Sequence, residues 1–155
     1  YTDRIQGKQQ QNLEQDVGDF VIRRKDGFFA YQLAVVVDDA YQKITDIVRG
    51  IDLIDSTARQ ICLQQLLGLP QPIYAHLPVI VNEQGQKLSK QHRATPIDIS
   101  RPAELLIESL RFLQQSPDDN LVGCSPEEIL NWGIEHWNPD NLTNMTELQE
   151  SQSGL

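Results

Sequence analysis

The middle of the chain alternates between strand signals and helix signals, and this order restricts the fold more than any other feature. Residues 44–48 form a short apolar run typical of a buried strand, and residues 49–50 close it. A second apolar run occupies residues 77–81. Helix signals lie between the two runs, so the order strand, helix, strand indicates an α/β fold.

The helix predicted between these strands has its own start and stop signals. Asp55 or Ser56 can cap its first turn, Gly68 can end it, and Pro70 prevents it from continuing. The apolar side chains fall on one face, which carries Ala58, Ile61, Cys62 and Leu66. The pattern therefore predicts an amphipathic helix.

Upstream of this region the sequence is less decisive. Residues 20–24 are rich in β-formers and precede a turn at residues 25–27, which predicts a strand entering a turn. Residues 29–40 fit two structures, because apolar side chains recur at helical spacing while three consecutive valines at 35–37 favour a strand. Periodicity alone leaves both alternatives open.

The last third of the chain is helical in composition. Pro102 suits a first helical turn, and apolar residues follow at helical spacing at Leu106, Leu110 and Leu113. Ser125 and Glu128 form a capping box that predicts the start of a second helix. Residues 138–155 are polar without a core pattern, which predicts a disordered tail.

Composition and the chain ends limit the class of protein. The net charge of −9 argues against phosphate binding across the whole surface, so any nucleic-acid contact is expected to be local. No apolar run approaches the roughly 18 residues of a membrane span. Cys62 and Cys124 lack the spacing of a zinc site or a disulfide framework, which favours a reducing cytoplasm. The chain begins at Tyr1 and has Met145 as its single methionine, so we expect a piece of a longer protein or a processed product.

A short basic loop carries the strongest chemical signal. It follows a predicted turn at residues 82–85 and consists of Lys87, Leu88, Ser89, Lys90 and Gln91. Two mobile ammonium groups around a small hydroxyl can neutralise charge that builds on the α-phosphate and the departing pyrophosphate of a triphosphate. The alternative is an ordinary solvated basic patch on an exposed turn.

Several segments of the chain are far more specific together than this loop alone. In order, they are residues 18–23, Tyr31 with residues 36–39, residues 47–53, residues 75–78 and residues 87–90. This order closely resembles the second half of the catalytic domain of glutamate-type class I aminoacyl-tRNA synthetases, in which the basic loop corresponds to the KMSKS element. The resemblance covers residues 1–115.

The resemblance implies an architecture for each part of the chain. Residues 1–17 are expected to be a connector from a missing N-terminal half. Residues 18–99 are expected to be the C-terminal half of a Rossmann-like nucleotide-binding domain, with ATP at the carboxyl ends of parallel strands. Residues 100–137 form a small helical segment, and residues 138–155 form the tail. In this setting residues 29–40 become mainly helical.

Within that family the chain is most similar to the short paralogues that attach glutamate to queuosine in tRNA(Asp). Residues 3–7 and Gln91 match these paralogues, and the part after the loop is too short for the large anticodon-binding domain of an ordinary glutamyl-tRNA synthetase. Three alternatives remain open. They are a fragment of the ordinary enzyme, a separately encoded half of a split enzyme, and a non-catalytic remnant that binds tRNA or an amino acid.

The resemblance also implies roles for individual residues in glutamate binding. Tyr31 is expected to contact the amino-acid substrate, and Arg49 to pair with its side-chain carboxylate through a planar fork that lysine lacks. The alternatives are a core aromatic for Tyr31 and a surface charge for Arg49. Val35 departs from the asparagine of many ordinary glutamyl-tRNA synthetases. The acidic pair at residues 38–39 is expected to be solvated or paired with a base.

For ATP, the resemblance makes Lys90 the residue that stabilises the reacting phosphates, with Lys87 and Ser89 assisting. Asp52 is either a ribose contact or a helix cap. Leu77, Pro78 and Val79 are expected either to border the adenine or to form an ordinary buried strand. His76 is either a structural histidine or a ligand.

The implied reaction needs glutamate, ATP with Mg²⁺ as the substrate complex, and tRNA(Asp) bearing queuosine. The family's HIGH element, the residues that hold the substrate amino group and the zinc-binding insertion all lie upstream of the segments present here. A half-site cannot hold both substrates in attack geometry, so we expect negligible activity from this chain alone.

Overall fold

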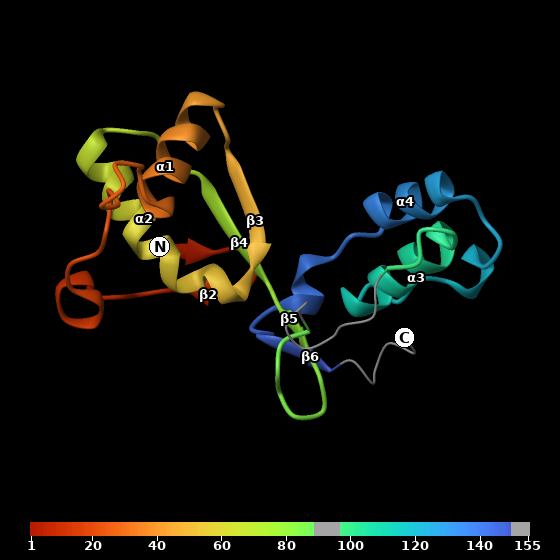
Figure 1. Ribbon diagram of the computed structural model, residues 1–155. Coiled ribbons are helices and arrows are strands. Elements are labelled where there is room, and N and C mark those ends of the chain that lie inside the picture. Colours follow the sequence, from red (N-terminus) through yellow and green to blue (C-terminus); the bar gives the residue numbers. More distant parts are fainter. Residues whose placement is uncertain (89–96, 150–155) are drawn as a thin grey trace. The chain divides into compact units, whose positions relative to one another are not determined.

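The computed structural model describes residues 1–88 and 97–149, so Ser89, Lys90 and Gln91 of the predicted phosphate loop lie outside the described residues. The chain divides into two compact units, Tyr1–Leu77 and Pro78–Leu155 (Figure 1). The division falls inside residues 18–99, which the sequence predicts to be one half-domain. Strands and helices of both units belong to a mixed α/β chain, which confirms the predicted fold class.

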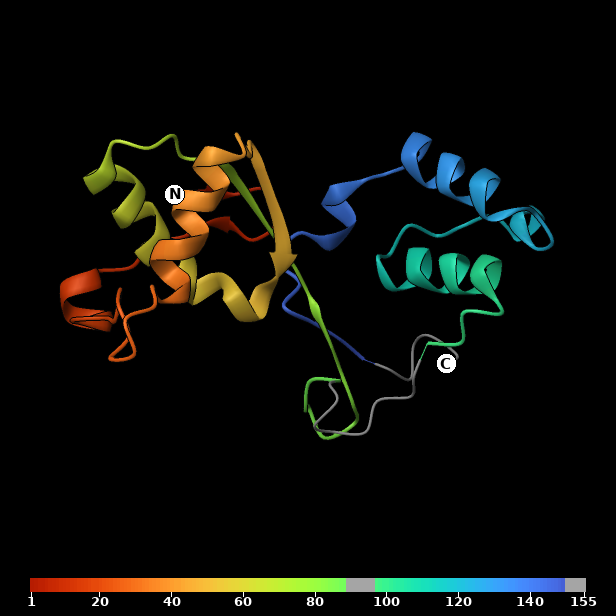
Figure 2. The same cartoon turned by 45° about the horizontal axis from the view of Figure 1, so that its top comes forward.

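The first unit is built on two parallel strands, β3 (Asp46–Gly50) and β4 (Ile73–Leu77). Helix α1 (Tyr31–Tyr41) precedes β3, and α2 (Ile54–Leu67) connects β3 to β4. The two helices pack against each other and lie on the same side of the strand pair (Figures 1 and 2). The strand, helix, strand order is as predicted, but the second strand is not the predicted one. It is β4 (Ile73–Leu77), whereas the predicted apolar run at residues 77–81 forms β5 (Val79–Val81) of the second unit.

Helix α2 ends as predicted but begins differently. Gly68 terminates it in the left-handed conformation, with φ of 65°. Neither Asp55 nor Ser56 caps its start, because the short 3₁₀ turn η2 (Ile51–Leu53) runs directly into the helix and leaves Leu53 at the cap position.

The buried face of α2 is not the predicted apolar one. Leu66 is 76% exposed, and Ala58, Ile61 and Cys62 are only partly buried. The buried positions are mostly polar: Thr57, Gln60, Leu63 and Gln64. The polar side chains among them can be buried because each makes a hydrogen bond. Thr57 bonds to Arg49, Gln60 to Gln32, and Gln64 to the Tyr74 hydroxyl.

The N-terminal segment, predicted to be a connector, is folded. Strands β1 (Thr2–Asp3) and β2 (Gly7–Lys8) pair antiparallel, and a π-helical turn, η1 (Leu13–Val17), follows. The backbone N–H of Arg4 donates to the carbonyl of Tyr74 in β4 at 2.9 Å. Long-range contacts to β4 therefore supply an order in this segment that the local pattern did not indicate. The connection of residues 1–17 to an N-terminal half stays a prediction.

In the region before β3, the structure tests the predicted strand at residues 20–24 and decides between strand and helix for residues 29–40. Residues 20–24 do not form a strand of their own, and make a single antiparallel bridge between Arg23 and Phe29 around a turn that contains Gly27. Residues 31–41 are helical, as the family resemblance implied for residues 29–40.

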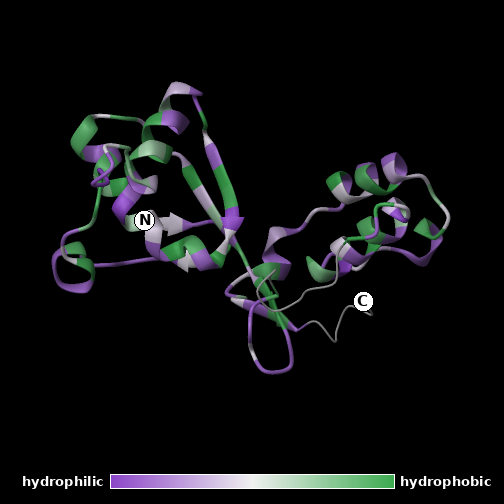
Figure 3. Ribbon diagram, in the orientation of Figure 1, coloured by the Kyte–Doolittle hydropathy of each residue, from purple (hydrophilic) through white to green (hydrophobic). Residues whose placement is uncertain are grey.

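The second unit combines a short strand pair with two helices. Strands β5 (Val79–Val81) and β6 (Glu147–Gln149) are parallel, and α3 (Pro102–Phe112) and α4 (Pro126–Glu135) pack together. Both helices carry hydrophobic residues (Figure 3), and the buried core between them consists of Ile107, Leu121 and Ile129. The capping box of Ser125 and Glu128 is confirmed.

The described part of the predicted tail is ordered. Residues 138–149 contain the 3₁₀ turn η5 (Pro139–Leu142) and strand β6, while a further 3₁₀ turn, η4 (Asp119–Leu121), lies before α4. Leu142 is 0% exposed and Leu148 is 7% exposed. The prediction of disorder is wrong here, because these two leucines and the pairing with β5 anchor an otherwise polar segment.

Candidate functional site

The carboxyl ends of β3 and β4 bring several predicted site residues to one edge of the first unit. Arg49 in β3 is in register with His76 in β4, and Gly50 is in register with Leu77. Asp52 follows in η2, exposed to solvent. In open parallel sheets the carboxyl edge is where ligands bind, so this edge is the candidate site.

Two hydrogen bonds hold the Arg49 side chain along one edge of its guanidinium group. Nε donates to Nε2 of His76 at 3.0 Å, and Nη2 donates to the Thr57 hydroxyl at 2.8 Å. The guanidinium carbon lies 5.4 Å from the centroid of the Tyr74 ring, within cation–π range. The other N–H groups of Arg49 make no hydrogen bond to residues 1–88 or 97–149.

Arg49 also lacks an ion-pair partner within the described ranges of the chain. Its charge is nevertheless felt by Asp39: burial raises the pKa of that carboxyl, the Arg49 charge opposes the rise, and Asp38 adds to it. A part-buried guanidinium with an unoccupied edge and no carboxylate partner is chemically suited to a ligand carboxylate.

Behind Arg49 lies a buried acid–imidazole pair that the sequence did not indicate. Nδ1 of His76 is 2.6 Å from a carboxylate oxygen of Asp3, and both side chains are fully buried. Burial alone would raise the pKa of Asp3, but hydrogen bonds from the Gln6 backbone, from the His76 side chain and backbone, and from the Ile5 backbone lower it below its ordinary value. Asp3 is therefore held as a carboxylate.

An aromatic ring supports both Arg49 and His76. Tyr74 stacks on the His76 ring with a centroid distance of 6.3 Å, and Tyr1 meets its edge at 5.9 Å. Burial raises the pKa of the Tyr74 hydroxyl, against the opposing hydrogen bond from Gln64 and the opposing charge of Arg49. The rings of Tyr1, Tyr74 and His76 thus pack together beside Arg49 in the candidate site.

Tyr31 comes from a helix that is tied to the same edge. It is the first residue of α1 and is 50% exposed. The next residue, Gln32, donates to the Ser56 hydroxyl at 2.9 Å, and Ser56 neighbours the Thr57 that holds Arg49. The start of α1 therefore lies beside the start of α2. Within the described residues Tyr31 and Arg49 share no hydrogen bond.

The remaining predicted ATP residues belong to the second unit. Pro78 and Val79 are partly buried at its start, and Lys87 and Leu88 follow the turn at residues 82–85. That turn is confirmed: Asn82 accepts hydrogen bonds from the backbones of Gln84 and Gln86, and Lys87 bridges back to Val81. The turn at residues 82–85 comes shortly before the predicted phosphate loop at residues 87–91.

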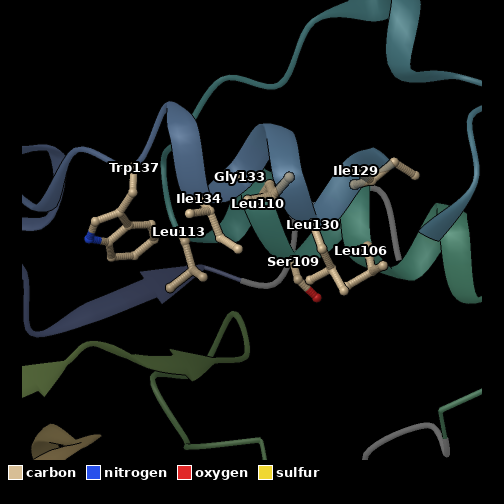
Figure 4. Close-up of a pocket in the computed structure, with 9 residues that line it drawn as sticks. All are labelled: Leu106, Ser109, Leu110, Leu113, Ile129, Leu130, Gly133, Ile134 and Trp137. Carbon is tan, nitrogen blue, oxygen red and sulfur yellow. The ribbon is translucent and has the colours of Figure 1, made fainter. Parts of the chain in front are cut away.

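A groove of about 280 Å³ between α3 and α4 contains no predicted site residue (Figure 4). Its lining is apolar except for the Ser109 hydroxyl, which already donates to the carbonyl of Leu105 at 2.7 Å. The lining residues are Leu106, Ser109, Leu110, Leu113, Ile129, Leu130, Gly133, Ile134 and Trp137. Without a polar group free to orient a substrate, the groove does not form part of the candidate site.

Neither a metal cluster nor a membrane span occurs in the part of the chain that the structure describes. No group of three or more His, Cys, Asp or Glu side chains among these residues could hold a metal ion. No helix among them is both long enough and apolar enough to cross a membrane.

A comparison with known protein families identifies the class of protein. Residues 1–128 match the family described as tRNA synthetases class I (E and Q), catalytic domain. The chain belongs to this family.

Curated relatives narrow the similarity further. The chain is 51% identical over 152 residues to the glutamyl-Q tRNA(Asp) synthetase of Ectopseudomonas mendocina (strain ymp), and 49% identical over 152 residues to that of Pseudomonas syringae pv. syringae (strain B728a). Each match covers 98% of this chain and 52% of the relative. The chain therefore spans about half the length of the curated relatives it matches.

Solved structures of glutamate-tRNA synthetases support the assignment of the chain to this family. A glutamate-tRNA synthetase from Elizabethkingia anophelis superposes with a TM-score of 0.72 at 25% identity, covering 99% of this chain and 34% of that one. A glutamate tRNA ligase from Elizabethkingia meningosepticum CCUG26117, solved in complex with its amino acid, gives the same values. The recognition of the family from five sequence segments is thereby confirmed.

Proposed function

We propose that this chain is the C-terminal part of a cytoplasmic enzyme that activates glutamate with ATP and transfers it to the queuosine base of tRNA(Asp). One observation carries the proposal: Arg49, at the carboxyl edge of β3, has an unoccupied guanidinium edge and no carboxylate partner among the described residues. The names of the relatives at 51% and 49% identity support the choice of acceptor.

In this function Arg49 pairs with the side-chain carboxylate of glutamate. A bidentate pair favours glutamate over glutamine, because the amide presents one acceptor and turns an N–H toward the cation. Tyr31, half exposed at the start of α1, adds a hydroxyl and an apolar wall for the same substrate.

ATP is the second substrate and binds as its Mg²⁺ complex to the residues that the family resemblance assigns to it. The loop residues assigned to the triphosphate are Lys87, Leu88, Ser89, Lys90 and Gln91. Lys90 neutralises charge on the reacting phosphates, and Lys87 and Ser89 assist it. Asp52 binds a ribose hydroxyl, and the backbone of Leu77, Pro78 and Val79 borders the adenine.

The reaction proceeds in two steps. The α-carboxylate of glutamate attacks the α-phosphorus of ATP, the bond to the β-phosphate oxygen breaks, and pyrophosphate leaves with its electron pair. A queuosine hydroxyl then attacks the carbonyl of the mixed anhydride, loses its proton and releases AMP. The chain contributes positioning and charge stabilisation, and no protein nucleophile is needed.

This chain supplies only part of the machinery. The HIGH element, the residues for the substrate amino group and the family's zinc-binding insertion belong to an N-terminal half. A half-site cannot bring both substrates into attack geometry, so the isolated chain has negligible activity.

The test joins this chain to the upstream half of the Ectopseudomonas mendocina relative, a protein referred to below as the fusion. We expect glutamate-dependent exchange of pyrophosphate into ATP by the fusion, background exchange by the isolated chain, and none with glutamine. Arg49→Ala in the fusion should lower exchange by about 100-fold or more, the cost of losing a charged, bidentate contact. Full activity of the Arg49→Ala fusion, or clear turnover by the isolated chain, would contradict the proposal.

A second candidate is the activity of an ordinary glutamyl-tRNA synthetase, because the similar solved structures carry that name. Acceptor choice separates the two: labelled glutamate on tRNA(Asp) with queuosine supports our proposal, and labelled glutamate on tRNA(Glu) supports the second. A well-folded fusion that catalyses no exchange would favour a non-catalytic remnant.

A further inference from the structure

A buried carboxylate and a buried imidazole stand directly behind Arg49 and take no part in the reaction proposed above. The Asp3 and His76 side chains are 0% exposed and meet at 2.6 Å. The second Asp3 oxygen accepts hydrogen bonds from the backbone N–H groups of Ile5, Gln6 and His76. Both groups are therefore fixed by contacts from two separate segments, the N-terminal hairpin and β4.

The arginine determines which ring nitrogen of His76 carries the proton. A guanidinium group only donates, so Nε2 of His76, 3.0 Å from Nε of Arg49, must accept. The ring proton is then on Nδ1, which donates to the Asp3 carboxylate. His76 is thus neutral, and it links the acid to the arginine through its two ring nitrogens.

The same contacts fix how the guanidinium plane is turned. Nε and Nη2 form one edge of the group, and they donate to His76 and to the Thr57 hydroxyl. The Thr57 hydroxyl and Nε2 of His76 also lie within hydrogen-bond distance of each other, at 3.2 Å, and because Nε2 accepts, the hydroxyl donates to it. The opposite edge, formed by Nη1 and the second N–H of Nη2, makes no hydrogen bond to the described residues.

A neutral imidazole in this position also preserves the charge of Arg49. If Asp3 paired directly with the guanidinium, the two charges would cancel, and an incoming carboxylate would meet a neutral pair. With His76 between them, Asp3 orients the ring while Arg49 keeps a positive edge for a ligand. The arrangement orients the guanidinium group and leaves Arg49 without an ion pair to any carboxylate among the described residues.

We propose that Asp3 and His76 are positioning residues that turn Arg49 so that its Nη1–Nη2 edge binds the side-chain carboxylate of the amino-acid substrate. The inference rests on the proposed function, because it takes glutamate as the ligand of that edge. It assigns a role to a residue from the extreme N-terminal hairpin, 46 positions away from Arg49 in the numbering of the chain.

The first test reads the hydrogen-bond chain without any substrate. Nitrogen-15 NMR of the isolated 155-residue chain should show His76 as the Nδ1–H tautomer, with a far-downfield Nδ1 proton that exchanges slowly with water. Asp3→Asn should shift or remove that signal. A protonated Nε2 or a doubly protonated ring in the folded wild-type chain would overturn the proposal, whatever the enzyme does.

The second test compares two substitutions of His76 in the fusion. Glutamine places its amide oxygen near the position of Nε2 and can still accept from Arg49, whereas asparagine ends near Nδ1 and cannot reach it. We expect His76→Asn to raise KM for glutamate about tenfold or more with KM for ATP unchanged, as for the loss of a hydrogen bond to a charged group. His76→Gln should stay within about threefold of wild type because it keeps that bond.

Leu63→Ala is the matched control, because Leu63 is buried in the same unit and touches neither Arg49 nor His76 through a hydrogen bond. It should lower the melting temperature while leaving both KM values unchanged. Equal KM values for His76→Asn and His76→Gln would overturn the positioning role. An unchanged KM for glutamate in Arg49→Ala would instead overturn the proposed function, so the two failures are distinguishable.

Discussion

At the scale of single residues, the Thr57 hydroxyl fixes the outer nitrogen of Arg49 and is 0% exposed. Thr57→Val keeps the shape of the side chain but removes the acceptor, so one N–H of a charged group loses its partner. We expect a loss of about 1–2 kcal/mol in the free energy of unfolding. In the fusion, KM for glutamate should rise severalfold. Urea denaturation and exchange kinetics measure the two effects.

Thr57→Ser is the control for this prediction, because serine retains the hydroxyl and loses only a methyl group. Its KM for glutamate should remain close to the wild-type value. If Thr57→Val and Thr57→Ser have the same KM, the hydroxyl has no role in orienting Arg49.

Asp3 gives the first unit a specific response to acid. Its folded-state pKa is lowered below the ordinary value of 3.8, so the ionised form stabilises the fold. That contribution is present in full above pH 3.8 and is lost as the pH falls through the lower folded-state pKa. We expect Asp3→Asn to be less stable at neutral pH and to show a weaker dependence of stability on pH below that value. Urea denaturation of both proteins between about pH 2.5 and pH 7 is the measurement, and parallel curves would contradict the prediction.

The same residues show what the sequence could and could not reveal about the site. Arg49 follows an apolar run, so its position near the end of a strand could be predicted. Its role in glutamate binding is implied by the family resemblance and stays a prediction. Asp3 could not, because its partner His76 is 73 positions away and a polar N-terminal segment carries no periodic signal. Thr57 was missed for a related reason, since a threonine inside a helix gives no local sign that it faces an arginine.

At the scale of secondary-structure elements, Gly68 ends α2 at φ 65°, and a β-carbon added to it would have no neighbouring atom within 4 Å. The cost of replacing it is therefore conformational and not steric. Gly68→Ala should lower the free energy of unfolding by about 1 kcal/mol, and Gly68→Asn by less, because asparagine tolerates the left-handed region better. Thermal or urea denaturation of both variants checks the order. Equal stability of the alanine variant and wild type would show that the helix end can rearrange.

Helix α2 also explains why some elements were predictable only in outline. Its existence and its end follow from local signals, since Gly68 and Pro70 act on the backbone itself. Its buried face does not, because Gln60 and Gln64 are buried through hydrogen bonds to residues in α1 and β4 that hydropathy cannot represent. Strand β6 was missed for the same reason, since its order depends on pairing with β5.

At the scale of the whole molecule, the candidate residues divide between the two units. Arg49 and Tyr31, assigned to glutamate, belong to the first unit, and Lys87, assigned to the triphosphate, belongs to the second. The two residues assigned to the glutamate substrate and the supporting pair of Asp3 and His76 thus all lie in residues 1–77. We infer that recognition of the glutamate side chain depends on the packing of the first unit, while the substrate amino group is assigned to the upstream half.

The acidic surface of the chain leads to a prediction about tRNA. With a net charge of −9, the chain lacks the excess of cations that drives extended phosphate binding, so its contacts should be confined to a few lysines such as Lys87 and Lys90. For single-stranded or duplex contacts, each neutralised phosphate contributes about 0.7–0.9 to the slope of log affinity against log salt, so the slope should not exceed about 2 in magnitude. Filter binding of tRNA(Asp) to the isolated chain at several salt concentrations measures it. Replacing both lysines by alanine should flatten the slope, whereas replacing Lys8 and Lys43 should leave it unchanged; a slope of about 5 or more would require an extended basic surface.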